Sequence, residues 1–344
     1  MHSSGFRAVW IALFANLLIF LTKAIAAWIG TSAAMFSEAL HSLSDLVNSI
    51  FLLIGMKLAC RPPDIEHPFG YGKEVYFWSF IASVFMFGVT SMGSLTRGYH
   101  QVVSPHPIAA VELITIALSL AMLFEIYAVR AAMRAVVNDV GIRARGFKVI
   151  MASFKNISNV ANPAVKFVFW EDLAALIGVI IALIAIFISE ITNNIVYDGI
   201  ASIIIGIMLG ALAIMLAYEN RDMIIGRAAH PNIIRRIGDI AMIVPGVTDV
   251  KEIKTMYIGA HSLLVNMTIE AKPRLNIELA DDVVAEVEKK IVTRLTIVKE
   301  INIEIIADDN IDNRQKEKEQ LNCTLDQVIS TDTPCAPGNQ APRK

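Results

Sequence analysis

Six long apolar runs, separated by more polar segments, occupy the first two thirds of the chain. They cover approximately residues 8–29, 33–56, 75–96, 108–130, 165–189 and 196–218. Each run reaches about 20 residues, the length that a helix needs to cross roughly 30 Å of hydrocarbon. The pattern therefore predicts six membrane-spanning helices, with both ends of the chain on the same side.

Shorter patterns and more charges follow from residue 221. They predict a helix at 231–242, strands at 250–257, 263–269 and 301–305, and a helix near 280–291. We therefore expect an α-helical membrane protein, with a six-span transmembrane bundle and a C-terminal α+β ferredoxin-like cytoplasmic domain. The expected division is a six-helix transmembrane domain at 1–220, a cytoplasmic domain at 221–308 and a disordered tail at 309–344, where charged residues and prolines gather.

Composition and charge support a membrane protein and indicate its orientation. The chain is 55% hydrophobic and 18% charged, and its mean hydropathy of +0.55 is too high for a soluble chain of this size. Lys and Arg gather after the second and fourth apolar runs, which predicts that both termini are cytoplasmic. The net charge of -2 gives no reason to expect a nucleic-acid partner. The lack of an Arg-rich amphipathic leader favours the inner (plasma) membrane of a cell.

A polar stripe runs along the second apolar run. Ser37, His41, Ser44, Asp45 and Asn48 share one helix face. His41 and Asp45 fall near the middle of the membrane, where burying an ionisable group costs roughly 2.5–3.5 kcal/mol on insertion scales. Two such groups on one face favour an ion path, although polar residues of this kind can also hold helices together by hydrogen bonds.

The fifth apolar run contributes a second acidic position. Glu171 and Asp172 are neighbours on a helix, so only one of them needs to face the bundle, and we expect it to be Asp172. Imidazole nitrogens and carboxylate oxygens are good Zn²⁺ ligands, and a tetrahedral site takes about four of them. The sequence predicts a metal site of His41, Asp45 and Asp172, completed by Glu171, water or another group.

Several segments fit one family pattern. They are Ala-Leu-His-Ser-Leu-Ser-Asp at 39–45, Arg-Pro-Pro-Asp-Ile-Glu-His-Pro-Phe-Gly-Tyr-Gly-Lys-Glu at 61–74, Asp172 six residues before Gly178, Asp198 opening the sixth run, and the helix-strand-strand-helix-strand order. Together, over residues 7–308, they resemble the cation diffusion facilitator family, in particular its branch similar to the ninth animal zinc transporter. The resemblance implies a homodimer that exports Zn²⁺ or a similar divalent ion from the cytoplasm in exchange for protons.

The resemblance also implies a ligand set, from which this sequence departs at one place. The family's central site takes two ligands from span two and two from span five, which match His41, Asp45 and Asp172. Val168 stands where many members have a His. Because a site richer in oxygen favours harder ions, Mn²⁺ or Fe²⁺ is an alternative to Zn²⁺ as the transported ion.

Two further places match metal sites of some relatives. Asp64 and His67 correspond to an interfacial site that includes another His, where this chain has Tyr71. A turn capped and hydrated by these polar residues explains them equally well. In the C-terminal domain His261 lies alone near the places where metal-binding relatives carry His, so we interpret this domain mainly as a dimerisation module.

Other functions are less consistent with the residues. A non-transporting membrane scaffold or metal sensor is the main alternative. An intramembrane metalloenzyme is not expected, because neither a His-Glu-x-x-His motif nor a nucleophile motif occurs, and no cofactor is predicted. Nucleotide-driven pumping is not expected either, because no phosphate-binding Gly-rich loop occurs. Lys23, Glu38 and Glu125 add charges at membrane depth that pair with each other or line the ion path, and pairing is favoured for Lys23.

Overall fold

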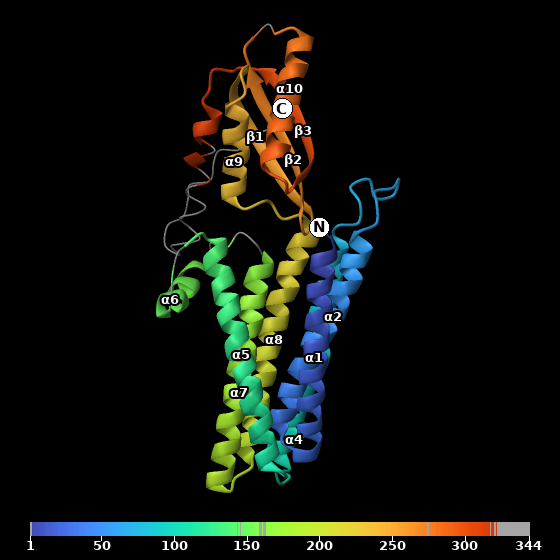
Figure 1. Ribbon diagram of the computed structural model, residues 1–344, viewed down its shortest axis with the longest axis vertical. Coiled ribbons are helices and arrows are strands. Elements are labelled where there is room, and N and C mark those ends of the chain that lie inside the picture. Colours follow the sequence, from blue (N-terminus) through green and yellow to red (C-terminus); the bar gives the residue numbers. More distant parts are fainter. Residues whose placement is uncertain are drawn as a thin grey trace. The chain divides into compact units, whose positions relative to one another are not determined.

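In the computed structural model the chain forms two compact units, and the division falls between residues 224 and 225 (Figure 1). It describes residues 2–142, 144, 146–157, 160, 163–273, 275–316, 318, 319 and 321. Unit 1 consists of long helices. Unit 2 is a small sheet with helices.

Unit 1 confirms the six predicted spans. In its described part, six helical segments are long and apolar enough to cross a membrane. They are α1 (His2–Gly30), α2 (Ala33–Ala59), α3 (Glu74–Phe85) continued by η1 (Met86–Ser91) and α4 (Met92–Val103), α5 (Val111–Asp139), α7 (Pro163–Thr192) and α8 (Val196–Ile225). A shorter helix, α6 (Phe147–Asn156), precedes α7. The chain is thus a multi-pass membrane protein.

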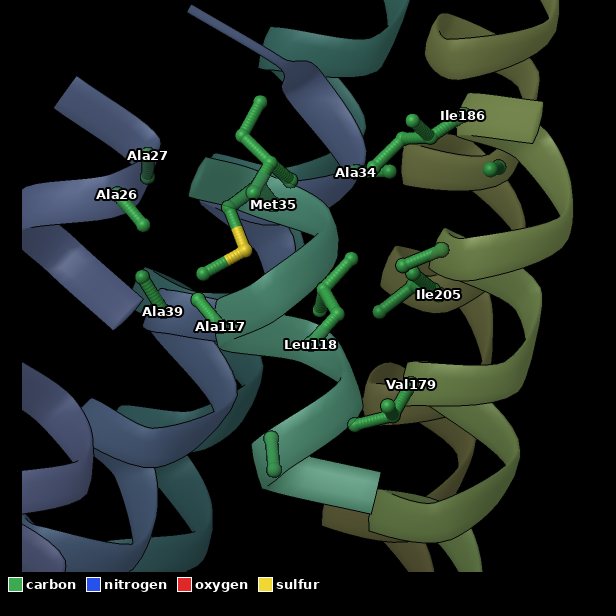
Figure 2. Packing of buried hydrophobic residues seen from close by; sticks show 14 of the residues in the cluster. Ala26, Ala27, Ala34, Met35, Ala39, Ala117, Leu118, Val179, Ile186 and Ile205 are labelled. Carbon is green, nitrogen blue, oxygen red and sulfur yellow. The ribbon is translucent and has the colours of Figure 1, made fainter. Parts of the chain in front are cut away.

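Small side chains dominate the centre of this bundle. Ala26 and Ala27 of α1, Ala34 and Ala39 of α2 and Ala117 of α5 are buried in one cluster. Figure 2 shows these alanines around a few larger side chains that fill the space between the helices. Because lipid is as apolar as the helices themselves, close approach of small residues is what holds membrane helices together.

The third span contains an irregularity that the hydrophobic pattern does not predict. Residues Met86–Ser91 form a π-helical turn, and the Met92 amide bonds to the carbonyl of Phe87, five residues back. Such a wide turn shifts the later residues of the helix around its axis. Thr90 and Ser91 are buried as a result, and the Ser91 hydroxyl donates to the Gly206 carbonyl of α8 at 2.8 Å.

Asp198, at the start of α8, caps the start of α2. Its carboxylate accepts hydrogen bonds from the Ser32 hydroxyl at 2.6 Å and from the backbone amides of Ala33 at 2.6 Å and Ala34 at 3.1 Å. The side-chain amide of Gln101 donates to it from α4 at 3.4 Å. A negative group satisfies the otherwise unpaired amides of a helix start. One buried carboxylate thus ties α2, α4 and α8 together.

Unit 2 confirms the predicted order of helices and strands. Its elements are α9 (Pro231–Met242), β1 (Val247–Gly259), β2 (Ser262–Ala271), α10 (Ile277–Arg294) and β3 (Val298–Ala307). Among the described residues the sheet order is β1-β2-β3. Met267 of β2 pairs with Ile253 of antiparallel β1 and with Ile303 of parallel β3. The parallel pairing needs a crossover, which α10 provides.

Residues after β3 extend this unit, although the sequence predicts a disordered tail from residue 309. Arg314 is only 4% exposed, and its guanidinium donates to the Arg235 carbonyl at 2.5 Å and to Asp239 at 3.1 Å. It lies on Gly238 of α9, in the space that a Cβ would need. The first part of the expected tail is therefore packed on α9, and residues 322–344 lie outside the described residues.

Candidate cation site

The polar stripe of α2 points into the bundle. His41 is 2% exposed, and its Nε2 lies 4.0 Å from Oδ2 of Asp45, one turn further along the helix. Both ring nitrogens of His41 and Oδ1 of Asp45 are buried without a hydrogen-bond partner among the described residues. Unpaired buried polar atoms are costly, so hydrogen bonding between helices does not explain these two residues. They are instead available as ligands.

Helix α7 faces this stripe with its acidic pair. Asn48 of α2 donates a hydrogen bond to Glu171 at 3.4 Å, so Glu171 is directed towards α2. Asp172 is half-buried and close enough to Asp45 for their charges to interact. The sequence favours Asp172 as the residue that faces the bundle, whereas the hydrogen bond to α2 is made by Glu171. The choice between them as an ion ligand stays a prediction. Val168, where the resemblance expects a ligand, is 47% exposed.

These side chains surround one region of the bundle, but their ligand atoms are too far apart to coordinate one ion. Among the described residues, three His, Cys or acidic ligand atoms come within 4.8 Å of one another only at Glu270, Asp308 and Asp309, in unit 2. His41, Asp45, Glu171 and Asp172 therefore form a polar region between α2 and α7 that is wider than a coordination shell. An ion bound there needs a small approach of the two helices.

A buried ion pair lies further towards the start of α2. The Lys23 ammonium of α1 is 2.9 Å from Oε2 of Glu38, and both side chains are no more than 2% exposed. This confirms the pairing predicted for Lys23. Oε1 of Glu38 has no hydrogen-bond partner among the described residues, and it occupies the space beside Gly178 of α7.

The bundle interior carries more acidic than basic groups. Its interacting charges are those of Lys23 and the carboxyls of Glu38, Asp45, Glu125, Glu171 and Asp172. Ionised carboxylates in hydrocarbon are expensive unless a cation or proton neutralises them. Five carboxyls close to one ammonium therefore favour the presence of a cation or of protons between them.

The loop between α2 and α3 has its own polar cluster. Both carboxylate oxygens of Asp64 already accept hydrogen bonds, from the Tyr71 hydroxyl at 2.6 Å and from the His67 amide at 2.7 Å. The bond from Tyr71 is the main reason why the pKa of Asp64 lies below its usual value. His67 stacks on Tyr71 with ring centres 4.2 Å apart. This geometry favours the capped turn over a metal site in this loop.

The acidic group in unit 2 was not identified from the sequence. Glu270 is fully buried, and Asp309 lies beside it. Lys251 places its ammonium 2.9 Å from Asp309 and 3.6 Å from Glu270, so it offsets one of the negative charges of this group. His261, the His that the sequence singles out in this domain, is exposed. These residues have the arrangement of a structural ion pair.

Comparison with known proteins gives two family matches. Residues 9–225 match the cation efflux transmembrane domain, and residues 229–305 match the cytoplasmic domain of cation efflux proteins. Both matches are to a transport family, in agreement with the expectation that the chain is not an enzyme. The two matched regions lie on either side of the division between the two units.

Individual relatives cover different shares of the chain. The mitochondrial proton-coupled zinc antiporter SLC30A9 of Xenopus laevis is 30% identical over 74% of this chain, and this chain spans only 44% of that protein's length. The manganese efflux system protein MneP of Bacillus subtilis is 23% identical over 87% of this chain and 95% of its own. A solved nickel form of a MamM C-terminal domain variant is 23% identical, with a TM-score of 0.22, over 23% of this chain and 98% of that one.

Proposed function

The chain belongs to the cation efflux family, and from this premise we propose that it exports a divalent metal ion, Zn²⁺ in the first instance, from the cytoplasm in exchange for protons. The observation that carries the proposal is the pair His41 and Asp45, whose ring nitrogens and Oδ1 are buried at membrane depth and have no hydrogen-bond partner in the described part of the chain. Asp172 and Glu171 on the facing helix supply the remaining oxygen ligands. The comparison with SLC30A9, named as a proton-coupled zinc antiporter, supports the same choice.

Proton exchange follows from the chemistry of these ligands. Zn²⁺ binds neutral imidazole and ionised carboxylate, so binding of the ion releases protons and protonation releases the ion. In the proposed orientation, with both termini in the cytoplasm, α2 starts at the outer face and α7 starts at the inner face. Rocking of α2 and α7 then opens the ligand set first to one side and afterwards to the other.

The choice of ion depends on one nitrogen ligand among several oxygens. His41 favours Zn²⁺, whereas the exposed Val168 at the position of a second His leaves the set rich in oxygen. Mn²⁺ or Fe²⁺ is therefore the alternative cargo, and the relative MneP is named as a manganese efflux protein. We propose a homodimer in the plasma membrane, with unit 2 as the cytoplasmic dimerisation module.

Flux through the purified full chain in proteoliposomes tests the proposal. We expect Zn²⁺ uptake driven by a proton gradient, with Mn²⁺ and Fe²⁺ as competitors. Asp45→Asn and Asp172→Asn should each reduce flux to background, and Glu171→Gln should weaken apparent ion affinity. Glu190→Gln, which alters an exposed carboxylate at the end of α7, serves as the matched control.

The outcomes separate the competing functions. Undiminished flux in Asp45→Asn and Asp172→Asn would defeat the assigned site. Ion binding by the wild-type protein without any flux would support the scaffold or sensor instead of a carrier. Flux that is independent of the proton gradient would indicate a uniporter instead of an antiporter.

A further inference from the structure

Glu38 lies on the α2 stripe that carries the proposed site, but closer to the start of the helix. It precedes His41 by three residues and Asp45 by seven, so it shares their face at a distance of about 10 Å from Asp45 along the axis. Its charge acts on His41, which places the two side chains in one electrostatic environment. In the proposed orientation, an ion that leaves His41 for the outer face passes Glu38 next.

The surroundings of Glu38 leave one of its oxygens unused. The side chain is 1% exposed, and Oε2 is paired with Lys23. Oε1 has no hydrogen-bond partner among the described residues and is aimed at α7, where Gly178 leaves room for it. A carboxylate that only joins α1 to α2 has no need of this space. An unpaired buried acceptor normally costs free energy, and transient binding of a cation at this oxygen would account for it.

We propose that Glu38 is a second cation ligand on the outward side of the ion path, and that the Lys23 ammonium occupies it as a tethered cation while no divalent ion is there. The ligand set of this transit position is Glu38 together with the neighbouring imidazole of His41. The inference rests on the proposed transport function and extends it by one step beyond the central site.

Other carboxyls can attract the Lys23 ammonium when a divalent ion displaces it from Glu38. The charges of Glu125 on α5 and Asp45 on α2 also act on its ammonium. A divalent ion that reaches Glu38 repels Lys23 towards these carboxyls, and departure of the ion lets the pair form again. The tethered cation keeps Glu38 neutralised between transport cycles, which avoids an isolated charge in hydrocarbon.

The competing explanation is a purely structural ion pair. Changing Lys23 or Glu38 alone does not distinguish the two, because each single change leaves one buried charge without its partner. The double variant Lys23→Met/Glu38→Gln removes both charges and keeps the side-chain volumes similar. Buried ion pairs replaced in this way often leave a protein stably folded.

The test compares binding with flux in this double variant of the full chain. We expect the double variant to bind Zn²⁺ in detergent with an affinity within about threefold of wild type, because the central ligands are intact. Its maximal Zn²⁺ flux in proteoliposomes should fall about tenfold or more, because the barrier to ion transit is higher. Flux within about twofold of wild type would overturn the inference. Glu190→Gln again provides the control for loss of a carboxylate.

Two further measurements keep the outcomes distinct. Absence of Zn²⁺ flux in the wild-type protein overturns the proposed function and this inference together, whereas retained flux in the double variant overturns the inference alone. If the double variant does not fold, Glu38→Asp replaces it, since it keeps the charge but withdraws the oxygens from His41. Its maximal flux should fall about tenfold with an unchanged affinity for Zn²⁺, and unchanged flux would overturn the inference.

Discussion

The Glu38 carboxylate of α2 projects into the space beside Gly178 of α7, and a Cβ at position 178 would overlap Oε1 of Glu38. The position of the Glu38 side chain therefore requires a glycine at position 178. A helix without a side chain at this point is what allows a buried carboxylate to fit between α2 and α7. This relationship links the packing of the bundle directly to its internal charges.

Gly178→Ala should destabilise the protein, because the added methyl group forces Glu38 away from α7. Overpacking of this kind costs about 1–3 kcal/mol. Thermal unfolding in a fixed detergent measures the change. Gly88→Ala is the matched control, since among the described residues no atom outside the adjoining stretch of its own helix lies within 4 Å of a Cβ at Gly88. Equal unfolding temperatures for the two variants would contradict the close approach of Glu38 and Gly178.

Asp198→Asn should loosen the start of α2. The amide group replaces an acceptor by a donor, so one of the hydrogen bonds from Ser32, Ala33 or Ala34 is lost, at a cost of about 1–3 kcal/mol for a buried group. Hydrogen exchange followed by mass spectrometry should show faster exchange at residues 33–36. Glu190→Gln should leave this exchange unchanged. A variant that unfolds and exchanges like wild type would show that Asp198 does not hold α2.

Tyr71→His should create a metal site in the loop between α2 and α3. The Tyr71 hydroxyl lies 2.6 Å from Asp64 and its ring stacks on His67, so an imidazole at this position joins a carboxylate and a second imidazole. Three such ligands suit Zn²⁺. We expect one additional Zn²⁺ per chain in equilibrium binding. Tyr127→His, on an exposed face of α5, should add none.

Acid should release the segment after β3 from α9. Burial opposes ionisation of Asp239, but hydrogen bonds and charges from Arg314 and Lys318 outweigh it and hold the pKa of Asp239 below its usual value. Because the folded-state pKa is lowered, the stabilisation is complete above the unfolded pKa of about 4 and is lost as the pH falls through the folded value. Pepsin cleavage within residues 308–316 should therefore increase below about pH 4.

The variant Asp239→Asn checks this assignment. It lacks the titrating carboxylate, so its cleavage should already be faster at higher pH and should lose the step on acidification. The exposed Asp222→Asn is the matched control outside unit 2. A step of the same size in Asp239→Asn would assign the acid sensitivity to another group.

The sequence predicts most of this fold because its main signals are local. The spans follow from the length of apolar runs, and the strands of unit 2 follow from alternation at positions such as Val265 and Met267. The π-helical turn at Met86–Ser91 has no such signal, since its hydrogen bonds skip one residue without changing the composition. Arg314 was assigned to a disordered tail because its neighbours are charged, whereas its burial depends on Gly238, far away in the sequence.

The candidate site shows the same division. His41 and Asp45 were identified because their spacing alone puts them on one face of α2. The roles of Glu171 and Asp172 depend on the rotation of α7 about its axis, which packing decides, and the hydrogen bond from Asn48 shows that Glu171 faces α2. Glu38 was noted as a charge at membrane depth, but its unpaired oxygen becomes visible only when α7 is in place.

The contact between Arg314 and Gly238 determines where this protein can be shortened. The family match ends at residue 305, so a stop codon placed there would delete Arg314 and Lys318. The α9 surface at Gly238 would then be uncovered, and Asp239 would lose both of these basic neighbours. Expression of unit 2 should accordingly extend through residue 321, and a shorter version is expected to aggregate because the contact of Arg314 with α9 is missing.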